Sequence, residues 1–230
     1  MERAVSQSLG YRLARQIINL FIPLMTRIEV HGLEYLPETG GYVIASNHLG
    51  RLDAILTYYF VDRDDIIMLA AEKYKEIAVA RWFAKQLNAI WVDRFNADLT
   101  ATRLALKRLK AGGVLVLAPE GTRSQSEALS KAWPGASYLA AKADALIVPV
   151  ALMGTEDSKV FPSWKRLRRA IVLVRAGKPF HLPPLPNQGR EQALQNYTDE
   201  IMCHIAAQLE PQYRGIYADH PRLKQILEEP

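Results

Sequence analysis

The strongest constraint in this sequence is a regular alternation between short apolar runs and longer helical patterns. Such alternation predicts a largely parallel sheet covered by helices on both faces, an α/β fold. We expect strands at 27–30, 42–46, 66–70, 89–92, 114–118, 145–152 and 170–177. We expect helices near 53–61, 74–87, 97–111, 135–143 and 190–209. Within 145–152, Pro149 is costly in a central strand unless a bulge or an edge accepts it.

The chain length fits a single domain built on this sheet. A chain of 230 residues can bury one sizeable core. We therefore expect the α/β domain over 27–210, preceded by a helical segment at 1–26 and followed by a polar, turn-rich tail at 211–230 that wraps the surface. The single cysteine, Cys203, excludes an intramolecular disulfide framework and is typical of a reducing cytoplasm.

The N-terminal segment has a strongly apolar helical pattern. Apolar residues recur at helical spacing from Leu9 to Met25, but the densest run, IINLFIPLM, is short and contains Pro23. Spanning a bilayer takes about 20 apolar residues, so this run is too short to cross one alone. The pattern is typical of an amphipathic helix lying in the membrane interface, and the alternative is a helix that packs on the domain. On the first interpretation, the membrane-contacting side chains include Leu13, Ile17, Phe21 and Leu24.

The charge of the chain favours an anionic partner. The net charge is +5 and the sequence pI is about 9.3, which suits nucleic acid, a phosphorylated metabolite or a membrane surface alike. A basic cluster at 165–169 is either a solvated face or a contact for anionic headgroups, at about 1 kcal/mol per basic residue. We add Trp164 and Arg168 to the predicted membrane contacts. We expect no nucleic acid partner, because the sequence has no recognition motif for one.

The most distinctive polar segment is ASNHLGRLDA, residues 45–54, which follows the strand predicted at 42–46. A plain turn does not need a histidine five residues before an aspartate. With Asp53 in the first turn of the next helix, its carboxylate can hold one nitrogen of His48 as N–H and leave the other free as a general base. The alternative makes Asp53 a helix N-cap and His48 an ordinary turn residue.

Two further segments place arginines where predicted strands end. The segment WVDR ends with Arg94, and PEGTRS, residues 119–124, contains Arg123. A guanidinium group is a planar fork that suits phosphate or carboxylate, and backbone N–H groups around a glycine add to such a site. We therefore expect an anion site at the carboxyl edge of the sheet. The alternative for the second segment is a helix capping box from Ser124 to Glu127.

Together with IVPV, these three segments form four blocks, NHLGRLD, WVDR, PEGTRS and IVPV, between residues 47 and 150. In this order and spacing they resemble the glycerolipid acyltransferase superfamily, specifically the bacterial 1-acylglycerol-3-phosphate (lysophosphatidate) acyltransferases. Two departures stand out. Ala118 occupies a position where many relatives have Phe or Tyr, and KAWPG, starting at Lys131, replaces their Phe-Lys-x-Gly stretch.

The resemblance implies a role for each matching residue. His48 corresponds to the general base and Asp53 to its partner. The residues implied to bind the phosphate of the acceptor are Arg94, Glu120, Gly121, Thr122 and Arg123. Asn47 and Lys131 are additional candidates for the site.

The reaction implied by the resemblance is transfer of an acyl chain from an acyl thioester to the free hydroxyl of a lysophospholipid. Acyl-CoA or an acyl carrier protein is the implied donor, with no cofactor and no covalent acyl-enzyme. The sequence has no G-x-S-x-G element, and Cys203 and His204 are adjacent in a helical pattern, so they do not face each other. We expect no metal site, because no set of residues has ligand spacing.

Two alternatives to this function remain at the level of sequence. One is an acyltransferase for another acceptor, such as glycerol 3-phosphate or a lyso-aminolipid. The other is a lipid-binding protein or a thioesterase. With an interfacial helix, we expect a peripheral or monotopic protein on the cytoplasmic face of the cell membrane, with membrane phospholipids as partners.

Overall fold

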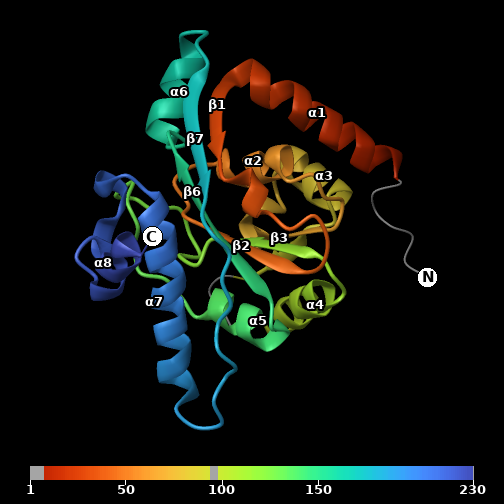
Figure 1. Ribbon diagram of the computed structural model, residues 1–230. Helices are drawn as coiled ribbons and strands as arrows, with labels where there is room; N and C mark the ends of the chain where they lie inside the picture. Colours follow the sequence, from red (N-terminus) through yellow and green to blue (C-terminus); the bar gives the residue numbers. More distant parts are fainter. Residues whose placement is uncertain (1–7, 94–97, 230) are drawn as a thin grey trace.

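Residues 8–93 and 98–229 are described by a computed structural model, drawn in Figure 1. Seven strands form one sheet in the order β1-β7-β6-β2-β5-β3-β4. Neighbouring strands run parallel, except that β6 and β7 are antiparallel. The strands are β1 (Thr26–His31), β2 (Tyr42–Ser46), β3 (Ile66–Ala71), β4 (Ile90–Val92), β5 (Val114–Leu117), β6 (Leu146–Met153) and β7 (Ala170–Ala176).

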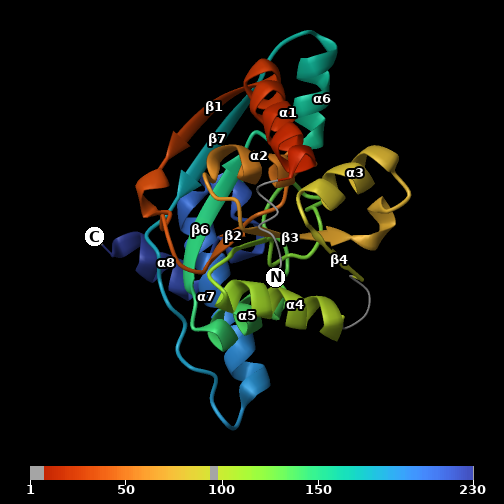
Figure 2. The ribbon, with the colours of Figure 1, turned by 90° about the vertical axis from the view of Figure 1, so that its right-hand side faces the viewer.

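Helices cover both faces of this sheet, as Figures 1 and 2 show. Strand β2 illustrates why, because all five of its residues are buried. Val43 and Ala45 pack against one core, and Tyr42 and Ile44 against the other. The helices over the first core are α4 (Leu99–Lys110), α5 (Gly135–Ala143), α7 (Arg190–Gln208) and α8 (Pro221–Glu228); those over the second are α1 (Leu9–Met25), α2 (Asp53–Phe60), α3 (Ala78–Gln86) and α6 (Asp157–Lys165).

The predicted α/β fold is confirmed, and all seven predicted strands are present with bounds within one residue. The five predicted helices are also present, although the pattern near 74–87 forms a helix only from Ala78, after a short 3-10 turn at Glu72–Tyr74. Two helices were not predicted, α6 and α8. Helix α6 contains Pro162 and buries only Val160, so its sequence lacks a helical apolar stripe.

Pro149 lies inside the sheet, and a shift in pairing explains how it is accepted. Its missing N–H faces the chain that follows β7, where Gly177 donates its N–H to the Pro149 carbonyl oxygen at 2.8 Å. Val150 pairs with Ala176, and Ile147 pairs with Phe180. The segment after β7 therefore has one more residue between these two pairs than β6 has. The expected bulge is therefore present, and no ladder hydrogen bond depends on Pro149 as a donor.

Helix α1 packs on the domain through one face and exposes apolar residues on the other. Tyr11, Ala14, Ile18 and Ile22 are buried in the second core. The opposite face carries exposed large apolar side chains at Leu9, Leu13, Ile17, Leu20 and Leu24. The predicted apolar pattern therefore combines two faces with different environments. No helix in the described part of the chain is long and apolar enough to cross a bilayer.

The C-terminal segment is more structured than the polar tail that we expected. It contains two 3-10 turns, at Pro211–Tyr213 and Gly215–Tyr217, followed by α8. Tyr213, Tyr217 and Leu223 are buried in the first core. The segment therefore completes the packing of the domain, because the apolar residues among its polar ones point inward.

Candidate active site

The polar segments found in the sequence meet at the carboxyl edge of the sheet. The order β6-β2-β5 places three neighbouring strands side by side, and the chain leaves each at this edge. The turn containing His48 follows β2, the PEGTRS loop follows β5, and a short turn starting at Gly154 follows β6. Chemistry in parallel sheets gathers at this edge, so topology alone brings these distant segments together.

His48 and Asp53 form a direct hydrogen bond. The distance from His48 Nδ1 to Asp53 Oδ2 is 2.7 Å, and the carboxylate is buried while the ring is partly exposed. The same oxygen accepts the backbone N–H groups of Leu49 at 2.8 Å and Gly50 at 2.9 Å. An ionised carboxylate only accepts, so Nδ1 carries the proton and Nε2 presents its lone pair. This is the arrangement that a general base needs.

The alternative view of this turn, with Asp53 as a helix N-cap, is wrong. Asp53 is the first residue of α2, and the N-cap position is Leu52, which makes no capping bond through its side chain. The Asp53 side chain instead points back to the turn that precedes it. Its second oxygen, Oδ1, is buried and has no hydrogen-bond partner in the described structure.

Gly50 allows the turn to lie against the chain after β6. A Cβ atom at this position would sit 1.8 Å from the carbonyl oxygen of Thr155, a distance that backbone packing does not allow. Asn47 fixes the start of the turn, because its side-chain amide donates to the Leu152 carbonyl oxygen at 2.8 Å and accepts from the Leu152 N–H at 2.7 Å. Asn47 therefore joins β2 to β6 and is buried away from the reacting space.

The PEGTRS loop holds His48 through both of its backbone groups. The His48 N–H donates to Glu120 Oε1 at 3.0 Å, and the N–H of Ser124 donates to the His48 carbonyl oxygen at 2.8 Å. The other carboxylate oxygen of Glu120 accepts from Ser130 N at 2.9 Å and Ser130 Oγ at 2.7 Å. Burial raises the pKa of Glu120, and these hydrogen bonds oppose that rise. Both oxygens are used within the protein, and a role toward an acceptor phosphate stays a prediction.

Arg123 is held by an aspartate that the sequence reasoning missed. Arg123 Nη1 lies 2.6 Å from Asp157 Oδ2, at the start of α6. The other oxygen of Asp157 accepts the backbone N–H of Arg51 at 3.0 Å. Arg51 belongs to the His48 turn, so Asp157 connects that turn to the PEGTRS loop. Its position just after a predicted strand, at the same edge as the other motifs, is the signal that identifies it.

The other predicted site residues vary in their surroundings. Gly121 has a φ of 69°, which favours glycine, and Thr122 is exposed beside it. Lys131 is exposed, with Nζ 5.5 Å from the centre of the Trp133 ring. Arg94 lies outside the described residues.

The capping-box alternative for Ser124 to Glu127 is wrong, because no helix begins there. Glu127 has a φ of 57°, in the left-handed region. Ser124 Oγ donates to the Ala128 carbonyl oxygen at 2.5 Å and so closes a local turn. The Glu127 side chain accepts from Ser158 Oγ of α6.

A thiol–imidazole contact occurs elsewhere in the fold, but not between Cys203 and His204. Cys203 Sγ lies 3.3 Å from Nδ1 of His220, the N-cap residue of α8. Burial raises the pKa of Cys203 to about 12, so its thiolate is disfavoured and the contact is structural. Within residues 8–93 and 98–229, no group of three or more histidine, cysteine and acidic side chains is arranged to hold a metal ion.

Comparisons with known proteins identify the family and the fold of this chain. A protein-family model described as Acyltransferase matches residues 27–153. The 1-acyl-sn-glycerol-3-phosphate acyltransferase of Bacillus subtilis is 27% identical over 198 residues, which cover 85% of this chain and 94% of that protein. The human 1-acyl-sn-glycerol-3-phosphate acyltransferase alpha is 27% identical over 169 residues, covering 71% of this chain and 56% of that protein.

A solved structure shares the fold. It is the 1-acyl-sn-glycerophosphate acyltransferase PlsC from Thermotoga maritima, with a TM-score of 0.64 and 22% sequence identity. The alignment covers 83% of this chain and 76% of that one. At this identity the likeness concerns the arrangement of the sheet and helices.

Proposed function

Because the chain belongs to the acyltransferase family, we propose that it transfers an acyl chain from a thioester to the free hydroxyl of 1-acylglycerol 3-phosphate, making phosphatidate for phospholipid synthesis. The observation that carries the proposal is the bond from His48 Nδ1 to Asp53 Oδ2, at an edge where the PEGTRS loop fixes the His48 backbone. Two relatives described above act, by their names, on the same acceptor class.

In the proposed reaction His48 is the general base. Nε2 removes the proton of the acceptor hydroxyl while that oxygen attacks the thioester carbonyl, and Asp53 stabilises the imidazolium that forms. The tetrahedral intermediate then collapses and expels the thiolate of coenzyme A or an acyl carrier protein, which takes up the proton. The acyl group passes directly between substrates, so no covalent acyl-enzyme forms.

The proposed acceptor site lies along the PEGTRS loop. Arg123 supplies a guanidinium fork for the phosphate, together with Gly121, Thr122 and Arg94. Asp157 binds one end of the Arg123 guanidinium at 2.6 Å, which leaves the remaining N–H groups to face a ligand. A carboxylate in this position orients the arginine and fixes its rotamer before substrate arrives.

An acceptor screen tests this assignment. The protein is incubated with labelled acyl-CoA and, separately, 1-acylglycerol 3-phosphate, glycerol 3-phosphate and a lyso-aminolipid, and mass spectrometry identifies each product. His48→Ala should lose turnover by about 10²–10⁴-fold. His181→Ala serves as the matched control, because this exposed histidine lies beside Asp144, ahead of the start of β6. Product formed only from glycerol 3-phosphate, or hydrolysis without transfer, contradicts the proposed acceptor.

We also propose that the protein attaches peripherally to the cytoplasmic face of the membrane through α1. Five large apolar side chains on its outer face are exposed, although the helix already packs through its other face. A row of exposed apolar residues opposite a packed face is typical of an interfacial helix. Phe21, which was also predicted to contact the membrane, instead packs its ring edge-on against Trp164, with 5.6 Å between the ring centres.

Substitution of the outer face tests this attachment without removing the helix. Leu20→Gln with Leu24→Gln should reduce sedimentation with anionic vesicles, because both side chains are exposed and their loss leaves the core intact. Leu99→Gln with Leu227→Gln is the matched control, since these leucines are exposed on α4 and α8. Equal vesicle binding by the two double variants contradicts an interfacial α1.

A further inference from the structure

A second cationic site lies on the opposite side of α6 from Arg123. A hollow of about 290 Å³ opens between α6 and the start of β7. Its polar lining comes from Lys159 and Ser163 on α6 and from Arg168 and Arg169 after it. These residues do not belong to the four sequence blocks, and Asp157, which holds Arg123, faces the other way on the helix.

The hollow carries positive charge that the described protein does not neutralise. Lys159 Nζ is paired with Glu156 Oε1 at 2.6 Å. Arg168 and Arg169, by contrast, have no ion pair with any described carboxylate. The Ser163 hydroxyl already donates to the Lys159 carbonyl oxygen at 2.9 Å. The two guanidinium groups without an ion pair therefore provide the donors that recognise a phosphate group.

The turn that forms the hollow contains a strained residue. Leu167 has a φ of 53°, the left-handed conformation in which a helix normally ends with glycine. The Arg168 N–H then donates to the Ser163 carbonyl oxygen at 2.9 Å, which brings the two arginines back against α6. The Leu167 side chain is 97% exposed, so it gains nothing from packing in return for this strain.

The surroundings of the hollow point to a lipid rather than a soluble anion. Leu167 and, at 75% exposure, Ile171 place apolar side chains in solvent beside the arginines. The hollow also adjoins the end of α1, because Trp164 Nε1 donates to the Met25 carbonyl oxygen at 2.8 Å and Thr26 pairs with Ala170. Figure 2 shows α1 and α6 side by side at the same end of the molecule.

We propose that this hollow binds the phosphate headgroup of a membrane phospholipid, with Leu167 and Ile171 inserted into the apolar layer beside it. The proposal rests on the peripheral attachment proposed above and adds a specific headgroup site to it. Arg168 and Arg169 donate N–H groups to the phosphate oxygens. Lys159, whose amine contacts Glu156 Oε1 at 2.6 Å and the Tyr213 hydroxyl at 2.8 Å, adds positive charge at the edge of the hollow. Apolar side chains next to basic ones match the boundary between headgroups and acyl chains.

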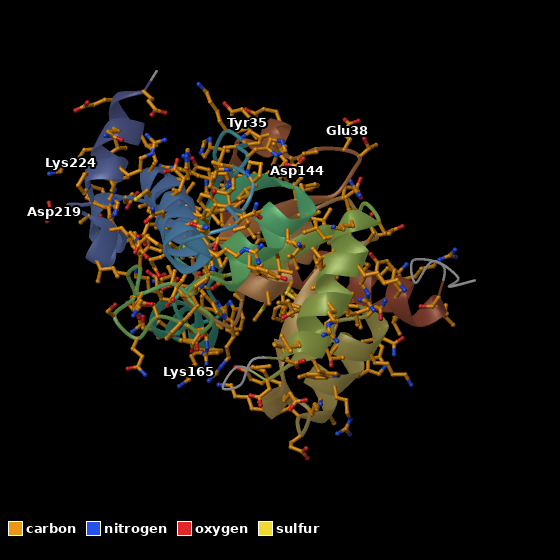
Figure 3. The ribbon with its side chains drawn as sticks, turned by 90° about the horizontal axis from the view of Figure 1, so that it is seen from below. Tyr35, Glu38, Asp144, Lys165, Asp219 and Lys224 are labelled. Atoms are coloured by element: carbon orange, nitrogen blue, oxygen red, sulfur yellow. The ribbon has the colours of Figure 1, made fainter. Side chains whose placement is uncertain are left out.

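Two double variants with the same loss of charge test the site. Arg168→Gln with Arg169→Gln removes the hollow's arginines, whereas Lys165→Gln with Arg166→Gln removes two exposed charges that do not line it. Lys165 lies at the rim of the molecule in Figure 3. With vesicles of phosphatidylcholine and phosphatidate, the Arg168/Arg169 double variant should bind at least 10-fold more weakly than the wild type. The Lys165/Arg166 double variant should bind about 3-fold more weakly or less. Equal losses would show diffuse attraction and overturn the site.

Two further experiments distinguish free phosphate from a lipid headgroup, and headgroup binding from insertion of Leu167. If millimolar inorganic phosphate stabilises the wild type but not the arginine variant, while both bind vesicles equally, the ligand is free phosphate and the lipid assignment is wrong. Leu167→Gly should keep the fold, because glycine accepts the left-handed turn, and should weaken vesicle binding. Unchanged vesicle binding by this variant overturns the insertion.

The same experiment distinguishes this site from the proposed function. Wild-type protein that fails to bind vesicles at all refutes peripheral attachment, and the headgroup site with it. Wild-type protein that binds, with equal losses in the two double variants, refutes the headgroup site alone. Turnover of a short, soluble acyl donor and acceptor without vesicles should be unchanged in the arginine variant, since its residues lie outside the His48 site.

Discussion

Replacement of Asp53 by asparagine is the sharpest test of the catalytic turn, because one carboxylate oxygen organises it. Oδ2 accepts three N–H donors, from His48 Nδ1 and from the backbone of Leu49 and Gly50, at 2.7–2.9 Å. Asparagine keeps the shape but removes the charge. Its amide nitrogen must also occupy either the position of Oδ1, which is buried without a partner, or that of Oδ2, where it would face three donors.

The expected cost in stability follows from these contacts. A hydrogen bond to a charged group contributes about 1.5–3 kcal/mol and a neutral one about 0.5–1.5 kcal/mol, so three weakened bonds cost about 3 kcal/mol. A buried amide N–H₂ without acceptors adds about 1–2 kcal/mol. Asp53→Asn should therefore lower the free energy of unfolding by about 4–5 kcal/mol. It should also lower kcat by about 10²–10⁴-fold, because His48 loses the group that fixes its tautomer and stabilises its protonated ring.

Two measurements on each variant separate these effects. Urea unfolding gives the stability, and turnover with saturating acceptor, below the onset of unfolding, gives kcat. Ser137→Ala is the control, since the buried Ser137 hydroxyl bonds to the Leu194 carbonyl oxygen and to Thr198, neither of which is a proposed site residue. It should cost about 1–2 kcal/mol without changing kcat. An Asp53→Asn protein that unfolds like the wild type and turns over within threefold of it would refute the proposed role of the carboxylate.

Three other predictions follow from contacts in the fold. Asn47→Ala should lower the free energy of unfolding by about 2–4 kcal/mol in urea titrations, because it leaves a buried N–H and carbonyl of β6 without partners; a loss under 1 kcal/mol contradicts this. Asp157→Asn should raise the acceptor KM more than it lowers kcat, since Arg123 loses its orienting partner; a raised donor KM alone would place Arg123 elsewhere. Burial acts to raise the pKa of Glu200, but hydrogen bonds from His204 and an arginine of α8 lower it to about 2. The ionised Glu200 carboxylate therefore stabilises the folded state above its unfolded pKa near 4.5, and this contribution declines as pH falls toward 2. The wild type should lose free energy of unfolding between pH 5 and pH 3, and Glu200→Gln should make that loss smaller by about 1–2 kcal/mol after allowance for solvent screening. Unfolding experiments at both pH values measure the difference.

The centre of the sheet was predictable because strands such as β2 and β6 are buried on both faces. Continuous apolar runs such as YVIAS at 42–46 match strands to the residue, and the alternation with helices fixed the parallel arrangement. The outer face of α1 was harder to interpret. A stripe of apolar residues wide enough to cover both sides of a helix does not reveal which side meets the core, and only tertiary packing separates Ile18 from Leu20.

The interior of the site was only partly predictable, since its bonds join residues far apart in sequence. The pairing of His48 with Asp53 followed from local spacing. The bonds from His48 to Glu120, from Asn47 to β6 and from Arg123 to α6 depend on the order of the strands, which a single sequence does not state. Asn47 was an additional candidate for the site, but its amide is used to join two strands.

Helix α6, which the sequence patterns did not predict, connects the two ends of the proposed mechanism. The Arg51 guanidinium lies over the Phe161 ring at 5.3 Å, Phe161 packs against Trp164 at 5.7 Å, and Trp164 packs against Phe21 of α1. This continuous path runs from the catalytic turn to the helix proposed to lie in the membrane interface. Closely packed side chains compress little, so the position of one element constrains the position of the next. With α1 in the interface, the same contacts would fix how the carboxyl edge faces the bilayer, and therefore the direction from which a lipid acceptor reaches His48.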